Sequence, residues 1–163
     1  ALLGRYPRGA RDEAEALARA LPSARLEIRP VEDIEHEMWR KLAVNCAINA
    51  LTAVHGCPNG ALLEPGAAGE AFAALCTETA AVLDALGQHA IAADLPATAA
   101  EVARRTAANR SSMLQDVLAR RRTEIDFING FLCRQADAAG IPCPLNRALR
   151  ARVHALEPGY PSA

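Results

Sequence analysis

Aromatic side chains are scarce in this sequence, at 4% of 163 residues with a single Trp, while hydrophobic residues of all kinds make up 51%. A core with few large rings has to be filled by small side chains in close contact, which suits helices that share small interfaces. A chain of this length can bury a real core without disulfides or metals to hold it. We therefore expect closely packed helices.

The sequence also has no excess of charge of either sign, since 18 Lys and Arg stand against 19 Asp and Glu. A net charge of -1 gives no overall field that would attract nucleic acid or an anionic membrane. The longest weakly charged run, residues 42–61, contains Asn, Thr, His, Pro and Gly and cannot cross a bilayer unaided. We expect neither a nucleic-acid partner nor a membrane partner.

The five cysteines show no disulfide or metal-binding pattern. Their number is odd, no two of them form a CxxC pair, and no His lies at metal-ligand spacing. The simplest interpretation is a set of reduced thiols in a cytoplasmic protein with no metal. The first residues also lack the basic and then apolar segments of a signal peptide, so none is predicted.

The first thirty residues differ in pattern from the rest. Residues 1–4 are typical of a strand end followed by a turn, residues 9–21 have helical spacing, and Leu26 and Ile28 alternate with charged residues as in a short strand. One helix followed by one strand cannot form a sheet by itself. We interpret residues 1–30 as the last fragment of an α/β domain whose other strands lie outside this sequence.

From Pro30 onward the pattern is almost wholly helical. Acidic residues stand at the start of the first helix, where the helix dipole favours them, and Gly and Pro separate the segments. The predicted helices span residues 31–55, 66–86, 96–109, 111–121, 124–139 and 145–156, the third with Pro96 at its start. The sequence therefore predicts a mainly α, bundle-like domain over residues 31–163.

A polar stripe interrupts the first of these helices. Lys41, Asn45 and Asn49 are four residues apart and share one helix face, in a segment otherwise rich in apolar residues. Burying an unpaired amide costs about 1 to 3 kcal/mol, so these side chains need partners. The partner is either a polar ligand or another helix, with the Lys41 stem lying over apolar surface in the second case. Spacing alone favours hydrogen bonds between helices.

Four other residues have an ordinary structural explanation when each is taken alone. Asn59 precedes Gly60, and this dipeptide is common in tight turns. Ser111 and Ser112 precede an apolar segment, as helix N-caps do, although the amides at a helix start can also hold a carboxylate. Glu124 is an acidic residue at a predicted helix start and needs no further role.

Four motifs, taken together and in order, resemble one family. They are Trp39-Arg-Lys-Leu-Ala-Val-Asn-Cys-Ala-Ile-Asn, Cys57-Pro-Asn-Gly, Ser111-Ser-Met-Leu-Gln-Asp and Thr123-Glu-Ile-Asp-Phe-Ile-Asn-Gly-Phe. From about Arg25 to about Leu149, the chain resembles the C-terminal half of the ketopantoate reductases (2-dehydropantoate 2-reductases). Four motifs in one order are more specific than any single one, so the resemblance favours a functional role for the polar stripe.

The resemblance implies a role for each candidate residue. Lys41 matches the catalytic lysine that protonates the oxygen formed when hydride reaches the keto carbon, and a cation is suited to this task because negative charge develops on that oxygen. Glu124 matches a glutamate associated with the cofactor and with closure of the active site. The positions that match substrate-binding residues are Asn45, Asn49, Asn59 and Ser112. Where the family often has Pro after the second asparagine, this chain has Ala50, which suits a straight helix.

The resemblance also implies parts that this sequence does not contain. NADPH needs a strand, a glycine-rich turn and a helix start to hold its pyrophosphate, usually marked by GxGxxG, and the sequence has no such motif. We expect the main cofactor site in an N-terminal Rossmann domain outside this sequence, with residues 1–30 as its remnant, and we expect the isolated chain to be inactive. The complete enzyme would reduce 2-dehydropantoate to (R)-pantoate in pantothenate and coenzyme A biosynthesis.

Two alternatives stay open. The first is a related reductase that acts on another keto acid. The second is a helical dimerisation module, a homodimer whose polar stripe is satisfied across a symmetric interface. Partner side chains at hydrogen-bond distance from Lys41, Asn45 and Asn49 would favour the second alternative, whereas an open groove beside them would favour an enzyme.

Overall fold

A computed structural model describes residues 1–4, 6, 11–21 and 28–159 of the chain. The chain divides into two compact units, Ala1–Lys41 and Leu42–Ala163, and each is described by itself. The assignment of residues 1–30 to a separate α/β domain stays a prediction.

The first unit begins with a small parallel βαβ arrangement. Strand β1 (Leu2–Leu3) pairs in parallel with β2 (Arg29–Pro30), and helix α1 (Arg11–Ala20) lies between them in the sequence, as a parallel pair requires of its connection. The strand predicted around Leu26 and Ile28 begins later, at Arg29, and Leu26 lies outside the described residues. The predicted helix of residues 9–21 is confirmed over Arg11–Ala20 as α1, and residues 9 and 10 lie outside the described residues.

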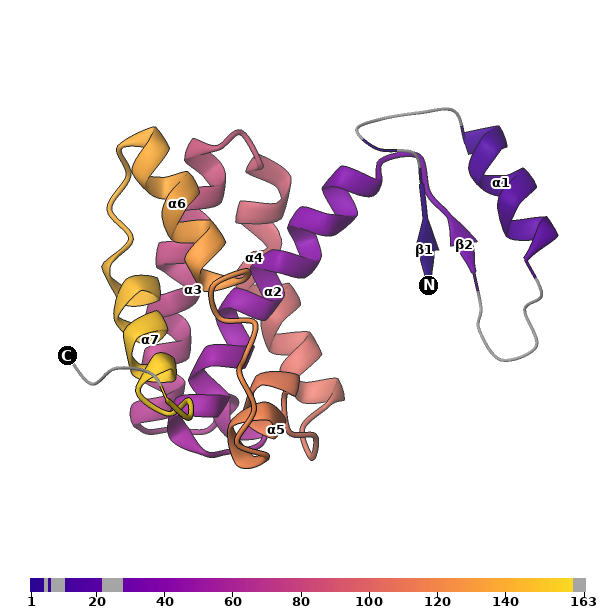
Figure 1. Ribbon diagram of the computed structural model, residues 1–163. Coiled ribbons are helices and arrows are strands. Elements are labelled where there is room, and N and C mark those ends of the chain that lie inside the picture. Colours follow the sequence, from indigo (N-terminus) through magenta and orange to yellow (C-terminus); the bar gives the residue numbers. More distant parts are fainter. Residues whose placement is uncertain (5, 7–10, 22–27, 160–163) are drawn as a thin grey trace. The chain divides into compact units, whose positions relative to one another are not determined.

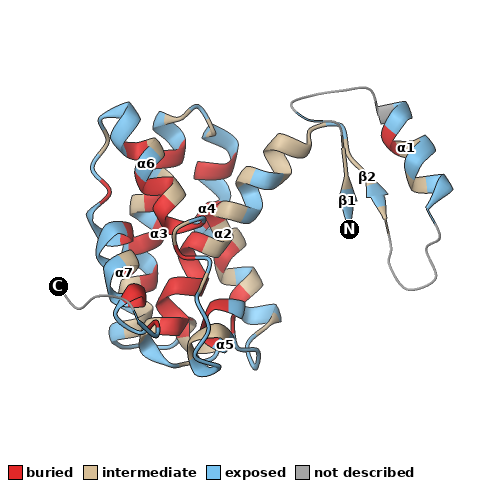
Figure 2. Cartoon of the chain, in the orientation of Figure 1, coloured by how far each residue is buried: buried red, intermediate tan, exposed pale blue. Residues whose placement is uncertain are grey.

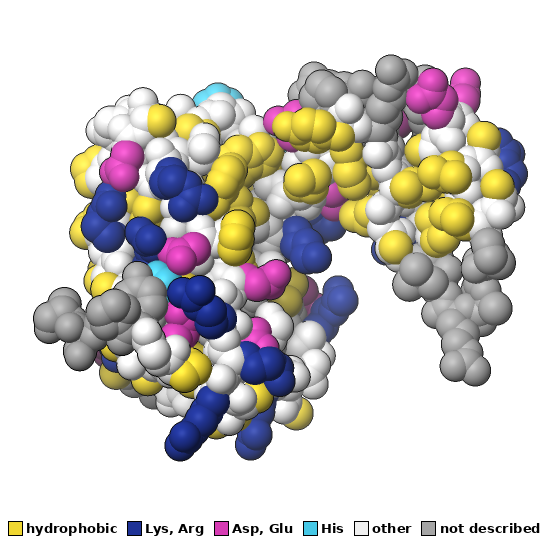
Figure 3. Space-filling model, viewed as in Figure 1, with side chains coloured by type: hydrophobic (Ala, Val, Ile, Leu, Met, Phe, Trp, Pro, Cys, Tyr) yellow, Lys and Arg dark blue, Asp and Glu magenta, His cyan; other side chains and the backbone are white. Residues whose placement is uncertain are grey.

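This first unit has very little core of its own. Among its described residues, Ala14 is the only buried hydrophobic one. The exposed large side chains of β1, α1 and their flanks are Leu2, Tyr6, Leu17 and Leu21. Figure 3 shows hydrophobic side chains gathered over this part of the chain. The strands and α1 therefore leave an apolar surface uncovered.

Helix α2 (Ile34–His55) is the long helix predicted from the sequence, and it starts three residues later than expected. The Asp33 carboxylate accepts the backbone N–H of His36 at 2.9 Å, which is the usual geometry of an N-cap and explains the start. Gly56, with a φ of 63°, ends the helix. From Cys46 to Ala53 every residue is buried, so this part of α2 is surrounded by other elements of the second unit (Figure 2).

Helices α3 (Ala67–Ala85) and α4 (His89–Arg105) pack against each other and are joined by a short link that contains Gly87. The prediction that the second of them begins at Pro96 is wrong, because α4 starts at His89 and contains Pro96 in its interior. The buried residues of α4 form one continuous stripe on both sides of the proline: Ile91, Ala92, Leu95, Ala99 and Ala103. Pro96 itself is on the exposed side, so its ring stays out of the packed interface between the helices.

The remaining elements are the 3₁₀ helix η1 (Asn59–Leu63) and the helices α5 (Ser112–Leu118), α6 (Asn129–Ala139) and α7 (Pro144–His154). The prediction that a helix starts at Glu124 is wrong, because residues 124–128 form turns and α6 begins only at Asn129. Ile125 and Ile128 in these turns are buried, so their side chains hold the segment to the core.

The mainly α fold is confirmed, with seven α-helices in the described part of the chain (Figure 1). Contacts of α3 with α4, α6 and α7 hold the second unit together, and α6 packs on α7. Completely buried alanines fill the contacts between helices, as the composition predicted: Ala43, Ala47, Ala50, Ala99, Ala103 and Ala136. Within the residues described, none of the helices has the length and apolar character needed to span a membrane.

Candidate active site

The three residues of the polar stripe all lie on α2, and their exposure falls along the helix. Lys41 is exposed, Asn45 is half-buried, and Asn49 is only 7% exposed. Among the described residues, none of the three side chains makes a hydrogen bond or ion pair within the chain. The hydrogen bonds between helices that spacing alone favoured are therefore not made by this stripe.

Asn59 begins η1, and its side chain is held by the end of α4. Its Nδ2 donates to the Thr106 hydroxyl at 2.9 Å, and its backbone N–H donates to the carbonyl of Asn109 at 2.9 Å. The Asn59 Oδ1 is buried and has no hydrogen-bond partner among the described residues. The glycine of the predicted turn at Asn59 and Gly60 is required by close packing and not by its backbone conformation. Gly60 is not in the left-handed region, but a Cβ there would lie 2.7 Å from the Cβ of Ala107.

Of the two serines, Ser111 is the helix cap and Ser112 is the exposed one. The Ser111 hydroxyl accepts the backbone N–H of Leu114 at 3.1 Å and the hydroxyl of Thr52, on α2, at 2.7 Å. Ser112 is the first residue of α5, and its hydroxyl has no hydrogen bond among the described residues. The capping interpretation therefore applies to Ser111 and leaves Ser112 available to a ligand.

Glu124 is exposed, and the segment around it is held to the end of α7. Thr123 donates to one oxygen of Glu157 through both its backbone N–H and its hydroxyl, each at 2.6 Å. Two residues after Glu124, Asp126 accepts from Arg150 at 2.6 Å. His154 lies between the carboxylates, with its ring nitrogens 3.0 Å from Glu157 and 3.1 Å from Asp126. We call these five residues, Thr123, Asp126, Arg150, His154 and Glu157, the carboxylate clamp.

The clamp changes the acidity of its two carboxylates. Burial works to raise the pKa of Glu157, but the hydrogen bonds from Thr123 and from the His154 ring outweigh it and lower that pKa below the usual value. Burial likewise opposes the hydrogen bonds from Arg150 and His154 at Asp126, and these bonds lower its pKa. Sequence analysis missed the clamp, because its two halves are about thirty residues apart. The only local signal was the helical spacing of Arg150 and His154.

Sequence analysis also missed a pair of carboxamides that do join helices. Asn129 and Asn146 are completely buried, and the Asn129 Nδ2 donates to the Asn146 Oδ1 at 2.8 Å and to the Cys46 carbonyl at 3.1 Å. The Asn146 Nδ2 donates to Glu78 at 3.0 Å. These amides hold α6 and α7 to α2 and α3, so they are structural in the sense first considered for Asn45 and Asn49.

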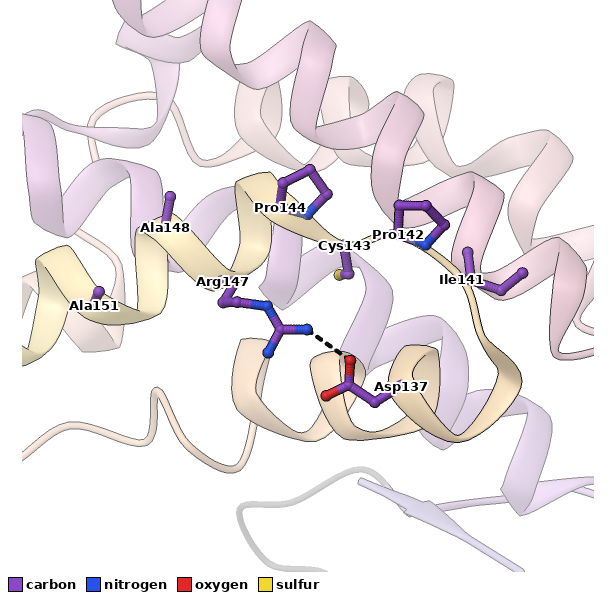
Figure 4. Close-up of a pocket in the computed structure, with 8 residues that line it drawn as sticks. All are labelled: Asp137, Ile141, Pro142, Cys143, Pro144, Arg147, Ala148 and Ala151. Atoms are coloured by element: carbon purple, nitrogen blue, oxygen red, sulfur yellow. Dashed lines mark hydrogen bonds and ion pairs between the residues drawn. The ribbon is translucent and has the colours of Figure 1, made fainter.

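An open depression in the described residues lies elsewhere in the helical unit. It has a volume of about 620 Å³ and is lined by residues that end α6 and begin α7, with none of the six candidate residues among them (Figure 4). The described part of the chain brings together no group of three metal-binding side chains. On the face visible in Figure 3, basic and acidic side chains alternate over the helical unit, as the ion pairs of Arg121 with Asp116 and Arg147 with Asp137 lead one to expect.

Comparison with known proteins assigns the family. Residues 33–157 match the family described as ketopantoate reductase PanE/ApbA C terminal. The chain belongs to this family. The ketopantoate reductase resemblance drawn from the four motifs is thereby confirmed, and all six candidate residues fall inside the matched range.

Individual relatives and solved structures agree with this assignment. The 2-dehydropantoate 2-reductase of Shigella flexneri is 48% identical over 128 residues, which are 78% of this chain and 41% of that protein. The solved structure of a PanE/ApbA family ketopantoate reductase from Ralstonia eutropha has 30% identity and a TM-score of 0.76, with 88% of this chain and 48% of that one covered. A D-mandelate dehydrogenase solved with NADH has 25% identity and a TM-score of 0.84, over 98% of this chain and 55% of that one. The chain thus spans about half the length of these relatives.

Proposed function

We propose that the chain is the substrate-side part of an enzyme that reduces 2-dehydropantoate to (R)-pantoate with NADPH, in the biosynthesis of pantothenate and coenzyme A. One observation carries the proposal. The polar groups of Lys41, Asn45 and Asn49 have no partner within the described chain, although Asn49 is almost completely buried. A carboxamide buried as far as that of Asn49 is normally hydrogen-bonded, so a ligand or a partner domain is expected to pair with it.

The reduction of a keto acid requires the kinds of side chain that α2 presents. When a hydride adds to the keto carbon, the former carbonyl oxygen becomes an alkoxide and must be stabilised and protonated. Lys41 is a cation with its own protons and no ion pair among the described residues, so it serves as the general acid. Asn45 and Asn49 bind the substrate's hydroxyl and carboxylate without adding a competing charge. Asn59 and Ser112 complete the proposed substrate-binding set, and we infer that the latter meets the substrate directly because its hydroxyl is exposed and unpaired.

The cofactor binds mainly outside this chain in our proposal. The described strands β1 and β2 have two residues each, and no GxGxxG turn accompanies them, so these residues do not fit the pyrophosphate of a dinucleotide. When bound, the nicotinamide supplies the hydride. Within the chain, Glu124 is the residue we assign to the cofactor, and the carboxylate clamp holds its segment in place. The uncovered apolar side chains of the first unit support a missing N-terminal Rossmann domain, without which the isolated chain would be inactive.

A reductase of another keto acid is the second candidate. The structural similarity to D-mandelate dehydrogenase, with a TM-score of 0.84, favours it, since that protein belongs to the same fold and was solved with NADH. The sequence favours ketopantoate, because identity is 48% to a 2-dehydropantoate 2-reductase and 25% to the mandelate enzyme. Assays of the full-length protein with ketopantoate and an aromatic 2-keto acid, each with NADPH and NADH, distinguish the two candidates.

The central test is the substitution Lys41→Ala in the full-length protein, with ketopantoate and NADPH as substrates. We expect kcat to fall by about 10² to 10⁴, as is usual for the loss of a general acid. The matched control is Arg40→Ala, which removes the neighbouring cation. Arg40 is exposed and pairs with Glu37 in the same helix, so kcat should stay within about twofold of the parent. A Lys41→Ala enzyme with normal kcat would refute the assignment.

The proposal also covers the cellular location of the enzyme and its oligomeric state. All five cysteines are free, which supports a cytoplasmic, reducing location. A homodimer is compatible with the unpaired stripe on α2 and stays a prediction, for which sedimentation of the full-length protein is the direct measurement.

A further inference from the structure

Two cysteine thiols lie side by side in the helical unit, and neither of them is a candidate active-site residue. Cys133 is on α6, and Cys143 is the residue before α7. The Cys133 thiol donates to the Sγ of Cys143 across 3.9 Å, and each residue is 2% exposed. The proposed reduction of a keto acid uses neither of them.

A small reagent can approach this pair through the open depression described above. Cys143 is one of its lining residues, and Figure 4 shows its side chain between Pro142 and Pro144, with the ion pair of Arg147 and Asp137 beside it. Arg147 donates to Asp137 at 2.7 Å, so a charged side chain from each helix stands next to the sulfur atoms. Cys143 therefore lies between the depression and Cys133, and a reagent meets the pair from the Cys143 side.

The surroundings lower the pKa of one thiol of the pair and raise the pKa of the other. The hydrogen bond with Cys143 lowers the pKa of Cys133 to about 7 against the effect of burial, and the nearby Arg147 guanidinium adds to this while Asp137 and Glu78 oppose it. The same hydrogen bond and burial raise the pKa of Cys143. The two thiols carry two protons. The first is lost easily, because the remaining proton is then shared between the two sulfurs. The second is lost with difficulty, whichever sulfur carries the charge. Near neutral pH the pair offers one thiolate beside one thiol.

We propose that Cys133 and Cys143 form a reversible disulfide when the protein meets a small disulfide such as oxidised glutathione. The thiolate attacks one sulfur of the reagent, whose S–S bond breaks, and a mixed disulfide and one glutathione thiolate result. The second protein thiol then gives up its proton to the glutathione thiolate and displaces the other glutathione. The protein dithiol loses two electrons, and the reagent is reduced to two molecules of glutathione.

The local backbone allows the two sulfurs to come together. They must move from 3.9 Å to the bonded distance of about 2.05 Å. Cys143 lies at the end of the short loop that follows Gly140, and its side chain makes no capping hydrogen bond to α7. The movement therefore falls on a loop and breaks no helix. Burial raises the pKa of Cys46 and of Cys76, and the nearby Cys133 raises that of Cys46 further, so a thiolate is disfavoured at both.

The test is a direct search for the bond in the folded full-length protein. The protein is incubated with oxidised glutathione at neutral pH, the remaining thiols are alkylated, and the protein is digested with trypsin. Cleavage after Arg122, Arg134 and Arg147 separates the two cysteines into the peptides 123–134 and 135–147. We expect these peptides to be linked in one species that dithiothreitol separates. If they stay unlinked while the half-buried Cys57 becomes fully glutathionylated, the proposal fails.

Two variants and a pH series sharpen the result. Cys57→Ser should leave the linked species unchanged, whereas Cys143→Ser should abolish it and leave at most a mixed disulfide on Cys133. The pH series needs no variant. A thiol with a pKa of about 7 is half ionised at neutral pH. Its thiolate is less nucleophilic than that of an ordinary thiol, so its net rate of exchange is roughly fivefold higher. The rate of linkage should therefore rise from about pH 6 and level off by about pH 8. A rate that is flat over this range, or linkage seen only in denaturant, would overturn the proposal.

Discussion

The helical unit holds two pairs of asparagines that look alike in the sequence and differ in what they contact. Asn129 and Asn146 are completely buried and hydrogen-bonded to each other and to the backbone or carboxylates of neighbouring helices. Asn45 and Asn49, on α2, make no hydrogen bond with any described residue. The comparison teaches that burial and residue type do not identify a binding site. The informative difference is whether the side-chain N–H groups have acceptors within the described chain, as those of Asn129 and Asn146 do and those of Asn45 and Asn49 do not.

The largest effect is expected when the structural pair is broken. Asn146→Ala removes the acceptor of one buried Asn129 N–H and one N–H donor to the Glu78 carboxylate, so we expect the free energy of unfolding to fall by about 3 kcal/mol. Denaturant unfolding of the full-length protein measures it. Activity per folded molecule should change by less than about threefold. If stability fell by less than about 1 kcal/mol, Asn146 could not be called structural.

The functional pair should give the opposite result. For Asn45→Ala we expect kcat/KM for the keto acid to fall by about 10- to 100-fold, because a hydrogen bond to a charged ligand contributes about 1.5 to 3 kcal/mol. Stability should change by less than about 0.5 kcal/mol, since the side chain is half-buried and makes no bond within the described chain. Unchanged kinetics together with a clear loss of stability would remove the distinction between the two pairs.

A third experiment concerns the carboxylate clamp and uses pH. Because the folded protein lowers the pKa of Glu157 and of Asp126, their contribution to stability is complete above their unfolded pKa values and is lost as the pH falls through the folded ones. The unfolding free energy should thus decline below about pH 4.5. Glu157→Gln should cost about 1 to 2 kcal/mol at neutral pH and make this decline shallower. An equally steep acid decline in the variant would show that other carboxylates cause it.

The smallest effect sets the baseline for the other three. Glu101→Gln removes an ion pair with Arg104 on the surface of α4, where both side chains are more than half exposed. Exposed pairs of this kind contribute less than about 0.5 kcal/mol, so stability and kinetics should both stay close to those of the parent. A larger change in either would mean that the measurements cannot separate the two asparagine pairs.

Much of the fold could be predicted from the sequence, because local signals determine it. The N-cap at Asp33 and the glycine at position 56 bound α2, and the Ala-rich stretch closed by Gly87 gives α3. The start of α4 was predicted wrongly because Pro96 was treated as a first-turn residue. Its position opposite the buried stripe could be recognised only by following the spacing of Ile91 and Leu95 across it.

The candidate residues could be named from four motifs, but their surroundings could not. Which of Ser111 and Ser112 caps α5 depends on Thr52, fifty-nine positions before Ser111. The turns around Glu124 replace a predicted helix because Thr123 is bonded to Glu157, thirty-four positions later. Such pairings join helices that are distant in the sequence, and no periodicity of a single segment reports them.

The carboxylate of Glu78 has a consequence for the order in which the chain folds. From α3 it accepts the backbone N–H groups of Leu145 and Asn146, at 2.7 and 2.8 Å, and so satisfies the first turn of α7 in place of a local cap. An isolated peptide of residues 144–154 would lack this partner and is too short to stay helical in water. The last helix should therefore form late, on a template that α3 has already provided, and a ribosome must release most of this unit before its final segment can become ordered.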